Sequence, residues 1–133
     1  MTKWYEINSQ RSKFRQESTL DTELNSADMD ETTFYKVAQA AFAHILTILD
    51  DEDPDVVEAD MTAGVLKIHF PQGTPYILNT QRPVREIWLA AGKQAWHFRC
   101  EKSRWTCPKT GDELYSRLSD LIQERAGVAL SFK

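Results

Sequence analysis

The chain has 133 residues, of which 41% are hydrophobic and 27% charged, a mixture typical of one globular domain with a single core. No apolar run approaches the ~20 residues of a membrane-spanning helix, and no secretory segment is recognised at the start, so we expect a soluble protein. The net charge of −4 argues against nucleic acid as the main partner.

Negative charge is concentrated between residues 28 and 60. This segment holds ten acids and one base, a formal charge of −9, which leaves +5 for the rest of the chain. Residues 82–109, in contrast, hold seven bases and two acids. Such a polarised chain favours metal cations or a basic protein surface as partners of its acidic part.

The first predicted elements are a polar extension and a helix. Residues 1–27 lack a sustained apolar period, so we predict a flexible extension followed by one domain over residues 28–133. Apolar residues then recur at helical spacing from Phe34 to Leu49. Asp28 or Asp30 can cap this helix, which should end near Asp50.

Six short strands are predicted after this helix, at residues 56–61, 65–70, 76–79, 86–91, 95–101 and 104–107. The connections are short, so neighbouring strands should be antiparallel. Pro83 excludes a regular strand across its position.

A second helix is predicted after the strands. Thr110 and Glu113 have the spacing of a capping box, and Gly127 is a suitable stop. The order helix, strands, helix predicts an α+β fold: a two-layer sandwich with both helices on one face of an antiparallel sheet and the other face in water.

The two cysteines fall in one predicted hairpin. A turn at residues 102–103 places Cys100 opposite Trp105, and Cys107 then lies too far from Cys100 for an unstrained disulfide. We predict free thiols and a reducing compartment. A structural role as small buried residues is favoured over a metal or redox pair.

No catalytic motif is recognised: His44, His69 and His97 lack partners at zinc-ligand spacing and are predicted to lie at the surface. The strongest local signal is a run of carboxylates, which suit hard metal ions. The candidate ligands are Asp50, Asp51, Asp53, Asp55, Glu58 and Asp60. An open set of this kind should bind iron or other hard divalent cations weakly. The alternative is a solvated helix end that aids solubility.

Trp88 is the second signal. Ile87 and Leu89 belong to the core in the predicted strand, so Trp88 should point to the exposed sheet face, with Asn79 and Gln81 beside it. Arg82 lies close in sequence. An exposed Trp among such residues suits a protein interface. The alternative is a Trp half-covered by its sheet neighbours.

The stretch from Asn79 to Leu89 resembles the N-x-Q-x-P-x-x-x-I-W-L signature of frataxins. Residues 64–66, Trp105 and the helix start at residues 30–34 are also similar to the family, and residues 130–132 resemble the ending of its bacterial type. The resemblance covers residues 28–133. It implies the same helix–sheet–helix sandwich, with iron (Fe²⁺ or Fe³⁺) bound on the acidic stretch.

The family resemblance also implies partners. A cysteine desulfurase would bind the acidic stretch, and an iron–sulfur scaffold protein would bind the sheet around Asn79, Gln81, Arg82 and Trp88. The expected function is therefore an iron-binding regulator or iron chaperone of iron–sulfur cluster assembly, and not an enzyme.

Two alternatives to this function stay open. One is ferroxidase or iron-storage activity, and the other is a metal-independent acidic interaction module. We expect a monomer, with iron-dependent oligomers as the alternative. The expected compartment is the bacterial cytoplasm. The extension before Asp28 is longer than in typical bacterial members, so the mitochondrial matrix is the alternative.

Overall fold

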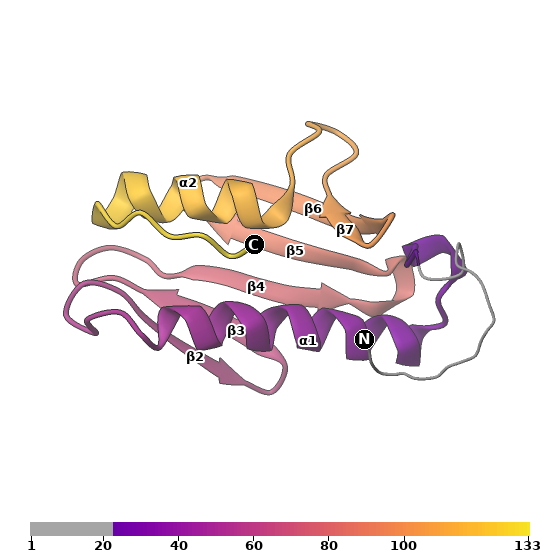
Figure 1. Cartoon of the computed structure of the whole chain (residues 1–133), viewed down its shortest axis with the longest axis horizontal. Helices are drawn as coiled ribbons and strands as arrows, with labels where there is room; N and C mark the ends of the chain where they lie inside the picture. Colours follow the sequence, from indigo (N-terminus) through magenta and orange to yellow (C-terminus); the bar gives the residue numbers. More distant parts are fainter. Residues whose placement is uncertain (1–22) are drawn as a thin grey trace.

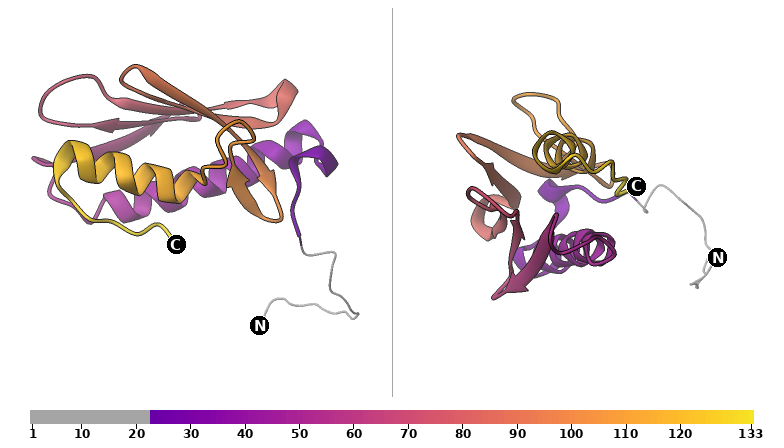
Figure 2. Two further views of the ribbon diagram at one scale, coloured as in Figure 1. Left: turned by 90° about the horizontal axis from the view of Figure 1, so that it is seen from above. Right: turned by 90° about the vertical axis from the view of Figure 1, so that its left-hand side faces the viewer.

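The computed structural model describes residues 23–133. Most of the extension predicted for residues 1–27 therefore lies outside the described residues. One six-stranded antiparallel sheet is covered on one face by two helices (Figures 1 and 2), which confirms the predicted α+β sandwich. The elements are η3 (Ser26–Asp28), α1 (Glu31–Leu49), β2 (Glu58–Thr62), β3 (Val65–His69), β4 (Tyr76–Gln81), η4 (Arg82–Val84), β5 (Glu86–Ala91), β6 (Gln94–Glu101), β7 (Arg104–Thr106) and α2 (Leu114–Ala126).

The strands lie in the sheet in chain order, β2-β3-β4-β5-β6-β7, and each pairs with the next. The register of β5 and β6 sets Ile87 opposite Phe98 and Leu89 opposite Trp96, and all four side chains are buried. Pro83 falls in η4, where no strand hydrogen bond is required of it. None of the helices within residues 23–133 combines the length and the apolar character needed to cross a membrane.

Both helices begin at a carboxylate cap. Asp30 caps α1 as predicted, because its Oδ1 accepts a hydrogen bond from the Thr33 N–H at 2.7 Å. The predicted Thr110 cap of α2 is wrong: the cap is Glu113, whose carboxylate accepts from the N–H groups of Tyr115 and Ser116. A bridge to Thr106 of β7 keeps Glu113 extended, so the helix starts only at Leu114.

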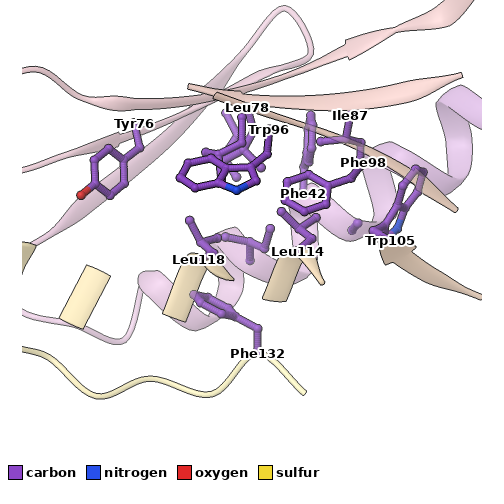
Figure 3. Packing of buried hydrophobic residues seen from close by; sticks show 14 of the residues in the cluster. Phe42, Tyr76, Leu78, Ile87, Trp96, Phe98, Trp105, Leu114, Leu118 and Phe132 are labelled. Atoms are coloured by element: carbon purple, nitrogen blue, oxygen red, sulfur yellow. The ribbon is translucent and has the colours of Figure 1, made fainter. Parts of the chain in front are cut away.

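The core lies between the sheet and the two helices (Figure 3), where Phe42 of α1, Phe98 of β6 and Leu114 of α2 are fully buried. The segment after α2 returns across the helices and buries Phe132 completely. The Nε2 atom of His44 forms a hydrogen bond with the Phe132 carbonyl, so α1 holds this segment in place.

The hairpin of β6 and β7 turns at Lys102 and Ser103, which both adopt positive φ. Cys100 lies opposite Trp105, as predicted, and both cysteines are buried and free. Residues 24–26 are fastened to this hairpin, since the Ser26 hydroxyl accepts from the Cys100 N–H at 2.8 Å and the Leu24 carbonyl accepts from the Ser103 N–H at 2.8 Å. The end of the predicted extension therefore packs against the domain.

Candidate functional site

The predicted metal ligands form one exposed surface, which we call the acidic ridge. Asp50 and Asp51 follow the last turn of α1, and Asp53 and Asp55 lie in the connection to β2. The ridge consists of the exposed residues Asp50, Asp51, Asp53, Asp55, Glu58 and Asp60, the last two on β2.

The ridge carries unfavourable electrostatics. No basic residue lies in the last turn of α1, so its negative dipole end faces Asp50 and Asp51 without compensation. Only part of the ridge has a local partner: Asp53 Oδ1 accepts the Asp55 N–H at 2.9 Å, and Asp60 Oδ2 lies 2.7 Å from Nε2 of His69. A cation or a basic surface would relieve this repulsion.

The ridge is an open surface and not a closed coordination site. Among residues 23–133, no three His, Cys, Asp or Glu side chains are grouped so that they could hold a metal ion. The donor chemistry fits iron because carboxylates are hard ligands, but the geometry supports only contacts from one or two carboxylates at a time.

Trp88 lies on the sheet face opposite the helices, as predicted, while Ile87 and Leu89 are buried. The indole is half-buried and not fully exposed, because the His97 ring stacks on it with centroids 4.1 Å apart and planes 7° apart. These two residues are directly opposite each other in the register of β5 and β6.

Glu86 links this stack to its surroundings. Its Oε1 accepts a hydrogen bond from Trp88 Nε1 at 2.9 Å and lies 3.7 Å from Nδ1 of His97, while its Oε2 lies 3.8 Å from Nη1 of Arg99. The Glu86 side chain is only 17% exposed. Water competes little for its hydrogen bond to Trp88, so this bond holds the indole in one position.

The remaining predicted partner residues divide into two groups. Asn79 lies opposite Trp88 on β4, and Gln81 donates to Asn79 Oδ1 at 3.2 Å, so these two belong to the same face. Arg82 does not join them, because its guanidinium lies 3.9 Å from the centre of the Tyr35 ring on α1. We call the following set the sheet patch: Asn79, Gln81, Glu86, Trp88, His97 and Arg99.

Sequence reasoning missed Glu86, His97 and Arg99 as members of this patch. The signal was present in the predicted strands, since pairing 86–91 with 95–101 through a short turn sets His97 beside Trp88. The stack itself depends on side-chain rotamers, which the strand pattern does not determine.

Comparison with known proteins places this chain in a family. Residues 27–128 match the model of the frataxin-like domain. The chain belongs to the frataxin family. Its curated relatives include the iron–sulfur cluster assembly protein CyaY of Cupriavidus metallidurans, which is 36% identical over 79% of this chain and 97% of its own length. The protein of the same name from Vibrio campbellii is 31% identical over 78% of this chain and 99% of its own length.

Solved structures of frataxins have the same fold. The frataxin of Psychromonas ingrahamii matches with a TM-score of 0.74 and 24% identity, over 79% of this chain and 99% of that one. A trimeric frataxin from the yeast Saccharomyces cerevisiae matches with a TM-score of 0.61 and 23% identity, over 69% of this chain and 80% of that one.

Proposed function

We propose that this chain takes part in iron–sulfur cluster assembly as a regulator that works through protein surfaces and not through catalysis of its own. The proposal is supported by family membership and by relatives named for cluster assembly that align over almost their whole length. The observation that carries it furthest is the presence of two chemically different surfaces, the acidic ridge on α1–β2 and the aromatic sheet patch on β4–β6.

The acidic ridge is proposed to bind a basic surface of a cysteine desulfurase. Its carboxylates are exposed and close in sequence, and such charges mainly set association rate and salt sensitivity. The sheet patch is proposed to contact the iron–sulfur scaffold protein. A half-buried Trp that is already held in one position is the kind of residue that carries affinity at the centre of an interface.

Iron is proposed as cargo and not as a resident cofactor. Ferrous ions should concentrate along the ridge because negative charge is densest there, and they should exchange readily because no closed ligand set surrounds them among the described residues. The two buried free thiols suit a reducing compartment such as the bacterial cytoplasm.

The experiment compares binding to a desulfurase alone and to a desulfurase–scaffold complex across a salt series. Asp50→Lys, Asp51→Lys and Asp53→Lys together should abolish desulfurase binding, whereas Trp88→Ala should spare it and weaken only the ternary complex. Glu23→Lys, Asp120→Lys and Glu124→Lys together are the matched control, since they make the same charge change at positions outside the ridge. Equal loss of both interactions in both folded test variants would refute the two-surface proposal.

The cargo proposal has its own measurement. Anaerobic addition of Fe²⁺ should shift the amide signals of residues 50–60 first, and Mn²⁺ should broaden the same signals. Admission of air should then oxidise iron no faster with the protein than with the ridge variant Asp50→Lys, Asp51→Lys and Asp53→Lys in equal amount. Faster oxidation that depends on the ridge would favour a ferroxidase, and signals that shift first at the histidines would contradict the carboxylate ridge.

A further inference from the structure

The stack of Trp88 and His97 places a titratable group in the sheet patch, beside the indole that is proposed to contact the scaffold protein. The imidazole covers one face of the indole, yet its side chain is 51% exposed. It can therefore exchange protons with water and also touch a partner. Histidine is the side chain whose ordinary titration range lies closest to neutral pH.

Gain of a proton by His97 would change two contacts together. The Nδ1 atom would become a charged donor facing Glu86 Oε1, 3.7 Å away, and the ring would become a cation stacked on the Trp88 face. Both changes hold the indole more firmly in the position that its 2.9 Å hydrogen bond to Glu86 already sets. Less side-chain freedom would then be lost when a partner binds Trp88.

The charges around His97 indicate the chemistry of that partner. The charged groups around its ring are Glu86 on β5 and Arg99 on β6, and the buried Cys107 thiol lies beside the main-chain N–H of His97. Glu86 carries one negative charge against Arg99 and a protonated His97, so the three groups together would carry one positive charge. Beyond Arg99, the hairpin adds exposed Lys102 and Arg104, with one exposed acid, Glu101, opposite Arg104. A protonated His97 would therefore extend a basic border of the sheet patch.

We propose that His97 is a specificity-determining residue of the sheet patch, whose protonation strengthens the binding of an acidic partner segment beside Trp88. This inference rests on the proposed function, because it names the chemistry and the regulation of the scaffold contact. The affinity of this contact rises as pH falls from 8 to 6.

Binding of the scaffold protein to the intact chain, measured between pH 8 and 6, tests the inference. The parent should bind roughly threefold or more tightly at pH 6. In His97→Gln the affinity should depend less on pH, because the contribution of His97 is lost. His97→Arg should bind tightly at both pH values. His69→Gln is the matched control, since it removes an exposed histidine that pairs with Asp60 outside the patch. Titration of the scaffold's own groups is common to all variants and cancels in the comparison.

A second measurement needs no partner. The indole N–H signal of Trp88 in the free protein should shift with the protonation of His97, and His97→Gln should make it independent of pH over this range. An indole signal that does not titrate, or a full binding slope in His97→Gln, overturns the inference. Trp88→Ala separates the two proposals. If Trp88→Ala binds the scaffold protein unchanged, the proposed function is refuted. If Trp88→Ala loses binding but His97→Gln keeps the full pH dependence of affinity, only the role of His97 is refuted.

Discussion

The carboxylate of Asp112 accepts a hydrogen bond from the indole N–H of Trp96, with 3.1 Å between Oδ2 and Nε1. The same side chain accepts from Arg117 at 2.7 Å and from the Thr110 hydroxyl at 2.8 Å. A residue just before α2 thus fastens the helix to the inner face of β6.

This arrangement predicts a pH-dependent loss of stability in Asp112→Ala. The hydrogen bonds from Arg117 and then Thr110 lower the pKa of Asp112 below its ordinary value. A carboxylate whose pKa is lowered in the folded state gives its full stabilisation at pH values above the ordinary Asp pKa of ~3.9. This stabilisation is lost as pH falls below that value and through the lowered pKa. Asp112→Ala should lower the free energy of unfolding by about 2–3 kcal/mol at pH 7.

Urea unfolding at pH 7, 5 and 3 measures this difference, which should persist at pH 5 and narrow toward pH 3. Asp120→Ala is the control elsewhere on α2 and should change stability by less than ~0.5 kcal/mol. A constant difference at all three pH values would show that lost packing, and not the ionised carboxylate, causes the effect.

The two thiols should differ in reactivity. Burial raises the pKa of Cys100 to about 11. Burial acts most strongly on Cys107 and raises its pKa, but hydrogen bonds from Thr110 and from the main chain of Lys109 and His97 together outweigh it and lower the pKa below the usual thiol value. At pH 8 Cys107 should therefore hold the larger thiolate fraction and react first with iodoacetamide in the folded protein. Peptide mass spectrometry identifies the site, and faster modification of Cys100 would contradict the prediction.

Removal of charge from the acidic ridge should stabilise the fold. Asp51→Asn with Asp53→Asn relieves repulsion at the negative end of α1, and the amide that replaces the Asp53 carboxylate keeps an oxygen to accept the Asp55 N–H. The melting temperature should rise, with a gain of up to ~1 kcal/mol in the free energy of unfolding. The gain should shrink in high salt because ions screen the same repulsion.

The control for this ridge variant is Asp120→Asn with Glu124→Gln, since both acids lie near Arg117 and should not stabilise the fold when they are neutralised. Thermal unfolding of the parent and both variants, at low and high salt, makes the comparison. A lower melting temperature in the ridge variant would mean that its acids are structural partners.

The returning C-terminal segment should be essential for stability. Phe132 is fully buried against Tyr115, and its carbonyl bonds to His44. Phe132→Ala should lower the free energy of unfolding by about 3–5 kcal/mol, the usual cost of removing a buried Phe. Ser131→Ala, at an exposed neighbour, should be nearly neutral. Chemical denaturation compares the two, and similar stability would mean that the core closes without Phe132.

The sheet was the most predictable part of this molecule. Alternating side chains determine which face of a strand is buried, so Ile87, Leu89 and the outward direction of Trp88 followed from the sequence. The α2 cap did not, because a β-bridge that folds the loop back between Thr106 and Glu113 overrides the spacing that favours Thr110. Local patterns do not encode such contacts.

The candidate site was only partly predictable for the same reason. The acids of the ridge are close in sequence, so their common surface was expected, whereas the separation of Arg82 from Trp88 depends on a ring far away in sequence, that of Tyr35. His97 lacked any motif of its own, and its importance arises from the residue across the strand pair.

The chain-order sheet has a consequence for how the protein folds. Every strand pairs with its successor, so each hairpin can close over a short loop at small entropic cost. The helices come from opposite ends of the domain, and burial of Phe132 needs both of them. We therefore expect the β-meander to assemble early and the helical layer to dock last, so that the slowest step of folding is the meeting of the two ends of the chain.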